Sequence, residues 1–407
     1  MRILLVTHYF PPEVGAPQAR LSELAAAWAE SGQAVTVLTG IPNHPTGVVP
    51  AEYRGVRCRV ESGRGYRIVR TWLYATPNEG ILKKTIGHVS FMITSVLLGA
   101  ARTGPVDVVV VSSPTFFSIG AGWVLAKLRR AKFVVEVRDL WPALFVELGV
   151  LTNRQVIRVL EKLELAAYSA ADAVVVVSEG FKQNLLARGV PDRKVHTIRN
   201  GVDLDRFASS TEAESSRLRE AGIADDEVVV LYIGAHGISQ GLTSVAEAAA
   251  LLTDLAVRVV LIGEGADKER VRARVADLGV QNVVMLPAVP RDEVPKLLAR
   301  ADVCLAPLRD VPLFSTFIPS KIFEYLAAGR AVVGSVTGEA AQILHEAGAV
   351  VVAPEHPEQL AAAIRELVMD PDLRRTMGSR GQAYVRANFD RRMLAHRYLE
   401  ILEGLPA

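Results

Sequence analysis

Short, nearly continuous runs of valine, isoleucine and leucine recur along the chain, separated by amphipathic stretches. In the first half these runs are Ile3–Val6, Ala34–Leu38, Val106–Val111, Phe133–Val137 and Ala173–Val177. The pattern restarts in the second half at Val228–Ile233, Arg258–Ile262, Val283–Leu286, Val303–Ala306 and Ala331–Val333. Apolar runs without alternation predict strands that are covered on both faces, as in parallel sheets. The restart predicts an α/β protein with two Rossmann-like, doubly wound domains.

The chain length and the break in this pattern suggest the domain boundaries. At 407 residues the chain exceeds one typical hydrophobic core. Residues 208–226 are polar and acidic, which is typical of a linker followed by a short helix. We therefore expect an N-terminal domain over residues 1–205 and a second domain over 206–389. A C-terminal helix over 390–407 is expected to pack back on the first domain.

Composition and charge exclude several classes of protein. Hydrophobic residues make up 50% of the chain and charged residues 22%, as in a folded globular protein. A net charge of +2 gives no strong attraction to nucleic acid. Cys58 and Cys304 do not make a disulfide framework, which favours a reducing compartment. The first apolar run is broken by His8 and by Pro11-Pro12, unlike a signal peptide, so we expect a cytoplasmic protein.

One apolar stretch, Ile86–Ala101, follows the basic pair Lys83 and Lys84. It contains His88, and we interpret it as too short and too polar for a membrane span. Periodicity does not separate a helix in the core of the first domain from one that lies on a membrane surface beside a basic patch.

Polar and ionisable residues follow two predicted strands of the first domain. The loop His8–Pro17 joins a strand to a helix at the ligand-binding edge of the sheet, so His8, Glu13 and Gly15 are candidates for contacts with a phosphate or an acceptor. Arg138 and Asp139 end the strand FVVEV and are the candidate catalytic residues there. The alternatives are a rigid connection for the loop and a structural ion pair of Arg138 with Asp139 or with Glu136. No Gly-x-Gly-x-x-Gly motif is present, which argues against a nicotinamide cofactor.

The second domain contains candidate ligands for a nucleotide diphosphate in several loops. In FIPSKIFEYLAAGRAVVG, a helix start with Ser320 and Lys321 is suited to an anion, and Glu324 one turn later to ribose hydroxyls. Further candidate donor-binding residues, in loops that also fit ordinary βα connections, are Gly234, Ala235, His236, Gln240, Glu264 and Pro287.

Four segments, in their order and spacing, resemble retaining nucleotide-sugar glycosyltransferases of family 4. They are VSEGFKQNLLARGVPDRKVHTIRNGVDLDRF, LIGEGADKERVRARVADLGV, LPAVPRDEVPKLLARADVCLAPL and PSKIFEYLAAGRAVVG. The resemblance implies the GT-B architecture, in which two Rossmann-like domains face each other across a cleft. HYFPPEVGAP, VRDLWP and PSKIFEY further resemble the branch with colanic-acid and O-antigen-type transferases of fucosamine-like sugars.

The chain departs from that family pattern at several positions. The resemblance aligns Glu324 with the ribose-binding glutamate of a Glu–seven residues–Glu motif, whereas Thr316 occupies the position of the first glutamate. Ala235 and Gln240 stand near the positions of the family's Arg and Lys, and Arg138 replaces the usual histidine. We expect Lys321, together with Arg309, to supply the missing positive charge.

The resemblance thus implies transfer of a sugar, with retention, from a nucleotide diphosphate to a hydroxyl group. Lys321 and the backbone amides of Ser320 and Lys321 are expected to stabilise the leaving diphosphate. The resemblance favours UDP as the nucleotide, an N-acetylated amino or deoxy sugar, and a polyprenyl-linked saccharide acceptor reached by peripheral contact with the inner membrane face. No cofactor and no metal are expected. The alternatives are transfer to a soluble metabolite, a nucleotide-sugar 2-epimerase, or a non-catalytic binding subunit.

Overall fold

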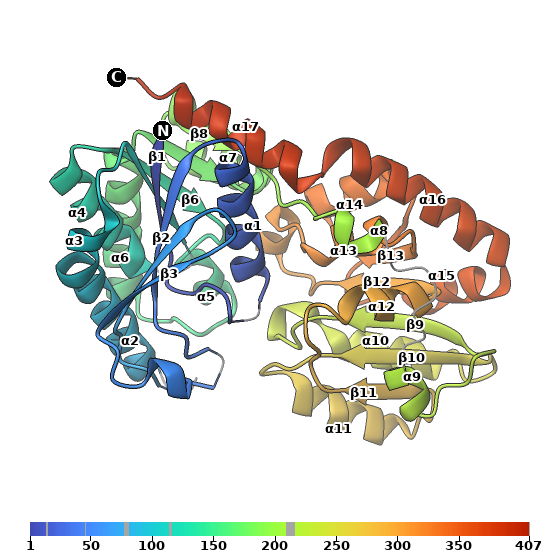
Figure 1. Cartoon of the computed structure of the whole chain (residues 1–407). Helices are drawn as coiled ribbons and strands as arrows, with labels where there is room; N and C mark the ends of the chain where they lie inside the picture. The colour runs from blue at the N-terminus through green and yellow to red at the C-terminus, as the bar shows by residue number, and fades with distance from the viewer. Residues whose placement is uncertain (14, 45, 77–80, 114–115, 209–215, 407) are drawn as a thin grey trace. The chain divides into compact units, whose positions relative to one another are not determined.

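The chain forms two compact units, each built around a mainly parallel sheet with helices on both faces (Figure 1). The computed structural model describes residues 1–13, 15–44, 46–76, 81–113, 116–208 and 216–406. Unit 1 consists of Met1–Asn200 together with Arg391–Ala407, and unit 2 of Gly201–Asp390. The predicted α/β class with two doubly wound sheets is confirmed.

Unit 1 contains an eight-stranded sheet in the order β3-β4-β2-β1-β5-β6-β7-β8. Its strands are β1 (Arg2–Val6), β2 (Ala34–Gly40), β3 (Cys58–Ser62), β4 (Arg67–Thr71), β5 (Val108–Ser112), β6 (Lys132–Val137), β7 (Ala173–Val176) and β8 (Val195–Thr197). All neighbouring strands are parallel except β3 and β4. The strand order reverses between β1 and β5, and the carboxyl ends of strands at such a reversal are where doubly wound proteins bind ligands.

Helices cover both faces of this sheet, and successive residues of its central strands alternate between the two faces. The helices of unit 1 are α1 (Ala16–Glu30), α2 (Ile81–Thr94), α3 (Ala100–Thr103), α4 (Phe116–Arg129), α5 (Ala143–Glu147), α6 (Arg154–Ala170), α7 (Glu179–Ala187) and α17 (Arg391–Glu403). Val108 and Val110 of β5 belong to the core cluster that includes α1 and α17. Val111 faces the other way, toward Gly122 of α4. Helix α4 in turn contacts α2 on one side and α6 on the other.

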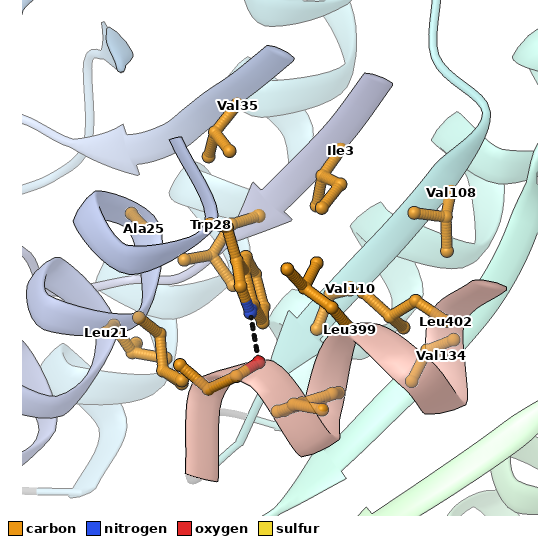
Figure 2. Packing of buried hydrophobic residues seen from close by; sticks show 14 of the residues in the cluster. Ile3, Leu21, Ala25, Trp28, Val35, Val108, Val110, Val134, Leu399 and Leu402 are labelled. Carbon is orange, nitrogen blue, oxygen red and sulfur yellow. Dashed lines mark hydrogen bonds between the residues drawn. The ribbon is translucent and has the colours of Figure 1, made fainter. Parts of the chain in front are cut away.

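The last helix of the chain, α17, completes the core of unit 1 (Figure 2). The indole nitrogen of Trp28 in α1 donates a hydrogen bond of 3.1 Å to the carbonyl oxygen of Ala395 in α17. The ring of Tyr398 lies edge-on to the Trp28 ring, with 5.2 Å between the centroids. Leu399 and Leu402 are buried in the same cluster. Unit 1 is therefore built from both ends of the chain.

The apolar stretch after Lys83 and Lys84 forms a longer helix than the sequence predicts. Helix α2 continues through a π-helical turn, η2 (Ser95–Gly99), into α3, and a Cβ on Gly99 would press against Leu38 of the sheet. By length and composition the helix Lys83–Thr103 could cross a membrane, which corrects the expectation that it is too short and too polar, although core helices of soluble proteins pass the same test. In the most apolar 18-residue window of this helix 22% of the residues are buried, which argues against a purely internal core helix.

Unit 2 contains a six-stranded parallel sheet in the order β11-β10-β9-β12-β13-β14. Its strands are β9 (Val228–Ile233), β10 (Val257–Ile262), β11 (Val283–Leu286), β12 (Val303–Pro307), β13 (Ala331–Ser335) and β14 (Val350–Val352). Its helices are α8 (Asp205–Ala208), α9 (Ser216–Glu220), α10 (Leu242–Ala250), α11 (Lys268–Leu278), α12 (Val294–Arg300), α13 (Lys321–Ala327), α14 (Gly338–Glu346), α15 (Pro357–Met369) and α16 (Pro371–Asn388). The strand order reverses between β9 and β12, which predicts a ligand site at their carboxyl ends.

Candidate functional site

The loop that leaves β9 packs directly on the loop that leaves β10. The amide of Gly234 donates to the carbonyl of Ile262 at 2.9 Å, and the amide of His236 donates to the carbonyl of Glu264, also at 2.9 Å. A Cβ on Gly263 would overlap the carbonyl oxygen of Gly234, and Gly263 has a φ of +153°. Glycine is therefore required at Gly263, because it permits both the positive φ and the close backbone approach.

His236 lies at the centre of this contact, and its side chain is completely buried. Neither ring nitrogen has a hydrogen-bond partner among the described residues. Burial, followed by the charges of Lys268 and Lys321, lowers the pKa of His236 to about 4. The ring is therefore neutral at physiological pH, with one donor and one acceptor nitrogen that the surrounding described residues leave unused.

Lys321, the first residue of α13, directs its ammonium group toward the β9 loop. Its Nζ lies 3.6 Å from the centre of the Tyr232 ring, a cation–π contact, and 3.5 Å from Oε1 of Gln240. Within the described part of the chain, no carboxylate forms a salt bridge with this ammonium. Burial lowers the pKa of Lys321 to about 7, although the nearby Glu324 carboxylate acts in the opposite direction. The site thus holds a cation that forms no salt bridge with a protein carboxylate among the described residues.

Helix α13 is attached to β9 by Tyr325. The Tyr325 hydroxyl accepts a hydrogen bond of 3.1 Å from the amide of Ile233 and donates one of 3.2 Å to the carbonyl of the same residue. Tyr325 is buried. It was not among the predicted site residues, although it lies within the motif that the sequence singled out. Its contacts fix where Lys321 and Glu324 stand relative to the glycine loop.

Glu324 is half-buried, one turn into α13. Burial raises the pKa of its carboxyl group, and the positive charges of Arg291, Arg206 and Lys321 act in the opposite direction. Arg206 also donates a hydrogen bond to the carbonyl of Arg291 at 2.5 Å. Neither arginine is among the predicted site residues, although both lie within the four segments that carry the family resemblance.

The start of α13 is a weaker anion site than the sequence predicts. The helix has seven residues, and Ser320 makes no side-chain cap. The amides of Ile322 and Phe323 already donate to the carbonyls of Pro319 and Ser320. The amides of Ser320 and Lys321 remain as candidate donors to a phosphate, and the Lys321 ammonium becomes the main candidate charge.

Glu264 and Pro287 mark the carboxyl ends of β10 and β11, where Lys268 joins the two strands. The Lys268 ammonium donates to the carbonyl of Gly263 at 2.8 Å, to Oε1 of Glu264 at 2.7 Å and to the carbonyl of Leu286 at 3.3 Å. Lys268 is buried, whereas Glu264 and Pro287 are exposed. The sequence did not predict this lysine, since its role depends on contacts between strands.

Arg309 and Thr316 lie in the segment between β12 and α13. The amide of Arg309 donates to the carbonyl of Ser239 at 3.0 Å, and its side chain packs over Gly241. The guanidinium also lies 3.6 Å from Glu355, so part of its charge is engaged. Thr316, at the position of the family's first glutamate, donates from its hydroxyl to the carbonyl of Leu313 at 2.7 Å.

In unit 1, Arg138 and Asp139 follow β6 at the carboxyl edge of the sheet. The guanidinium of Arg20, rather than Arg138, binds Glu136, at 2.8 and 3.0 Å. The structural pair of Arg138 with Glu136 is therefore not formed, and Nε and Nη1 of Arg138 are buried without a hydrogen-bond partner in the described structure. Burial raises the pKa of Asp139 to about 6, against the effect of Arg138.

His8, Glu13 and Gly15 lie in the loop after β1, and each makes a different kind of contact. His8 is buried beside His88. Glu13 is also buried, and its carboxylate accepts from the amides of Phe10, Asn43 and His44. This carboxylate therefore ties two loops together, while Gly15 caps the start of α1. The predicted residues thus form two groups, one in each unit.

Two family profiles match the chain, one in each half. The profile described as Glycosyl transferase 4-like domain matches residues 15–201, and the profile described as Glycosyl transferases group 1 matches residues 215–384. Two doubly wound sheets, each with its own glycosyltransferase profile, decide the assignment.

The chain is a GT-B glycosyltransferase.

Relatives and solved structures agree with this assignment. Over 91% of its length this GT-B glycosyltransferase is 28% identical to WcaI of Escherichia coli K12, named for colanic acid biosynthesis, with 93% of WcaI covered. It is 25% identical, over 99% of its length and 98% of the relative, to the GDP-mannose-dependent alpha-(1-6)-phosphatidylinositol monomannoside mannosyltransferase of Mycobacterium tuberculosis H37Rv.

Two solved structures share the fold over the whole chain. Sucrose-phosphate synthase from Thermosynechococcus elongatus has a TM-score of 0.78 at 20% identity, covering 99% of this chain and 98% of that one. Anabaena HepE, solved with UDP and glucose, has a TM-score of 0.74 at 18% identity, with both chains fully covered.

Proposed function

We propose that this glycosyltransferase moves a sugar from a nucleotide diphosphate, UDP, to a hydroxyl of a lipid-linked saccharide, with retention, in the biosynthesis of a surface polysaccharide. The observation that carries the donor half is the ammonium of Lys321. It lies at the strand reversal of unit 2 between two ligand-side loops and forms no salt bridge with a carboxylate among the described residues. A diphosphate supplies the missing negative charge.

Different residues of unit 2 bind different parts of the donor. Lys321, Gln240 and the amides of Ser320 and Lys321 stabilise the negative charge that develops on the leaving diphosphate. Glu324 accepts hydrogen bonds from the ribose hydroxyls, and the carboxyl ends of β10 and β11, joined by Lys268, border the nucleobase. The solved complex of HepE with UDP and glucose supports UDP, whereas the mannosyltransferase relative makes GDP the competing nucleotide.

The residues of unit 1 orient the acceptor. Arg138 has buried guanidinium nitrogens that lack hydrogen-bond partners in the described structure, so it can bind an oxygen of the reacting groups. Asp139 is held beside it. A phosphate oxygen of the leaving group takes the acceptor proton in this scheme, so no separate general base is required.

Exposed apolar side chains on one face of unit 1 support a lipid-linked acceptor. We name this the α2–α4–α6 face, since it lies on these three neighbouring helices and on the turn η2 that continues α2. Its exposed residues are Ile86, Ile93, Leu97, Trp123, Leu128, Val156, Val159 and Leu163. Between residues 81 and 132 the sequence has seven Lys and Arg residues and one acidic residue, Asp107, which pairs with Arg2. An apolar, basic face suits peripheral contact with an anionic membrane, where each cation adds about 1 kcal/mol. The WcaI relative supports an acceptor from polysaccharide biosynthesis.

The proposal is tested by measuring nucleotide release and product structure with the purified chain. UDP-sugars and GDP-mannose are supplied with and without vesicles that carry a polyprenyl-diphosphate saccharide. We expect UDP release to require the vesicles, and NMR of the product to show the anomeric configuration of the donor. Release of GDP only, an inverted product, or equal transfer to a water-soluble sugar would each contradict the corresponding part of the proposal.

A further inference from the structure

Three histidines of unit 1 gather at one small, open pocket at the carboxyl ends of β1, β2 and β4, with about 320 Å³ of free space when the adjoining open solvent is included. His8 follows β1, His44 follows β2 and His88 is on α2. The Nδ1 atoms of His8 and His88 are 3.4 Å apart, and the ring of Tyr9 lies 4.9 Å from that of His44. The complete lining is His8, Tyr9, Asn43, His44, Leu73, Tyr74, Thr76, Lys84, Gly87 and His88.

The lining of the pocket favours an anion over a metal ion. It includes three imidazoles, the Lys84 ammonium, an amide and two phenols, and it contains no Asp or Glu. Among the described residues, no group of His, Cys, Asp and Glu side chains is arranged to hold a metal. Imidazole N–H, ammonium and phenol groups are hydrogen-bond donors, which a phosphate oxygen accepts.

The pocket is preformed by contacts behind it. Oε1 of Glu13 accepts from the amides of Asn43 and His44, at 2.8 Å each, and this fixes the His44 loop against the β1 loop. His8 also packs on Phe91 of α2, with 5.0 Å between the ring centroids. The imidazoles therefore do not need to be gathered when a ligand arrives, which lowers the cost of binding.

Helix α2 connects the pocket to the exposed apolar surface. Lys84 and His88 of this helix line the pocket, while Ile86 and Ile93 of the same helix are exposed on the α2–α4–α6 face. A ligand with a phosphate head and an apolar tail could therefore use both sides of one helix.

We propose that this pocket binds a phosphate or diphosphate group of the acceptor. The proposal rests on the proposed function for the lipid tail, but the recognition of phosphate rests on the lining of the pocket alone. In it, Lys84 and the imidazoles of His44 and His88 donate to the phosphate oxygens, and Glu13 acts as a positioning residue through the amides of the His44 loop.

The test is isothermal titration of the full chain with inorganic pyrophosphate and with farnesyl diphosphate, at saturating UDP so that the donor site of unit 2 is filled. We expect both ligands to bind the wild-type chain and to bind Lys84→Met about tenfold more weakly, since one charge-assisted contact is lost. His44→Asn should weaken binding similarly. The matched control is Lys83→Met, which removes the neighbouring exposed cation but does not change the lining of the pocket.

The outcomes of this experiment separate the proposed phosphate pocket from the proposed function. The proposal that the pocket binds phosphate is overturned if Lys83→Met and Lys84→Met lose equal affinity for pyrophosphate and farnesyl diphosphate, or if neither loses any. This holds even if UDP binds and sugar transfer proceeds. A loss of affinity for these ligands that is confined to Lys84→Met and His44→Asn supports phosphate binding in the pocket, even if no sugar transfer is detected. Tighter binding of farnesyl diphosphate than of pyrophosphate assigns the phosphate to a lipid, whereas equal affinities assign it to a free anion.

Discussion

At the scale of single residues, Lys321 has the most unusual environment in unit 2. Its ammonium rests on the face of Tyr232, beside a neutral histidine and a glutamine amide, rather than against a carboxylate. A lysine in such surroundings is destabilised in its charged form, and a bound diphosphate removes that destabilisation. We therefore expect Lys321 to couple donor binding to its own protonation.

Removing the Lys321 side chain should slow turnover without unfolding the protein. We expect Lys321→Ala to reduce kcat/KM by roughly 10²–10³, the usual cost of losing a donor that stabilises developing charge. The measurement is steady-state nucleotide release, with circular dichroism as the control for folding. A folded mutant with nearly wild-type kcat/KM would remove Lys321 from the site.

The pKa of Lys321, about 7, also predicts how UDP affinity and the free energy of unfolding change with pH. Because the diphosphate prefers the ammonium form, affinity for UDP should fall as pH rises above 7, and Lys321→Arg should flatten that dependence. In the folded protein the pKa lies below the unfolded value of 10.5, so between about pH 7 and 10.5 the unfolded state binds more protons. This lysine's contribution therefore makes the free energy of unfolding increase with pH in that window. Calorimetric UDP titrations from pH 6 to 9 check the first effect, and urea unfolding of wild type against Lys321→Met checks the second.

Glu324 is predicted to act on the nucleoside rather than on the reaction step. Glu324→Gln keeps the size of the side chain but removes its charge, and we expect UDP affinity to fall about tenfold while kcat at saturating donor changes little. Titration calorimetry gives the affinity and initial rates give kcat. Unchanged UDP affinity, or a loss seen only in kcat, would reject the role in ribose binding.

At the scale of elements, the proposed donor site depends on the contact between the loops that leave β9 and β10. Two backbones meet there without an intervening side chain, with Gly234 on one and Gly263 on the other. Tyr325 then fixes α13 to the end of β9. The position of Lys321 is thus set by strands β9 and β10, by the contact between the loops that leave them, and by the hydroxyl group of Tyr325.

Substitution of Gly263 should test that contact. Gly263→Ala introduces a methyl group into the Gly234 carbonyl at a positive φ, so we expect a loss of stability of more than about 1 kcal/mol and at least tenfold weaker UDP binding. Gly279→Ala is the matched control, because Gly279 also has a positive φ but its Cβ would meet nothing within 4 Å. It should lose about 1 kcal/mol and keep its UDP affinity, as measured by urea unfolding and calorimetry. Equal UDP affinities of the two variants would show that the loop contact does not shape the site.

The sequence predicts the elements whose pattern is local and misses those that depend on distant partners. Val228–Ile233 was predicted with the bounds that β9 has, because its apolar run is continuous. Strand β3, by contrast, reads CRVES, is largely exposed and lies antiparallel at the sheet edge, so it carries no buried-strand pattern. The site follows the same division. The roles of Lys321 and Glu324 follow from the helix-start motif itself, whereas Lys268 and Tyr325, which lie in segments of the same kind, act through carbonyls and amides of residues far away in the sequence.

At the scale of the whole molecule, unit 1 depends on a helix from the other end of the chain. Trp28 is fully buried between α1 and α17, where its ring nitrogen is hydrogen-bonded. Trp28→Ala should destabilise unit 1 by about 3–5 kcal/mol, through the cavity and the lost hydrogen bond. Scanning calorimetry should show the unfolding transition of unit 1 falling by roughly 10 °C or more.

UDP identifies the transition of unit 2 in the same experiment, because ligand at about 100 times its dissociation constant adds roughly 2.7 kcal/mol of stability. That transition should keep its temperature in Trp28→Ala. A fall of the UDP-stabilised transition equal to that of the other would contradict a local role for Trp28.

The packing of α17 on unit 1 has a consequence for folding during synthesis on the ribosome. All of Gly201–Asp390 must be translated after Asn200 and before the first residue of α17. At 5–20 residues per second this takes roughly 10–40 s, during which the side of Trp28 that α17 will cover stays open to the cytosol. A nascent chain therefore displays a patch that chaperones can bind for as long as unit 2 is being made. A premature stop codon anywhere in unit 2 leaves that patch uncovered for the life of the fragment.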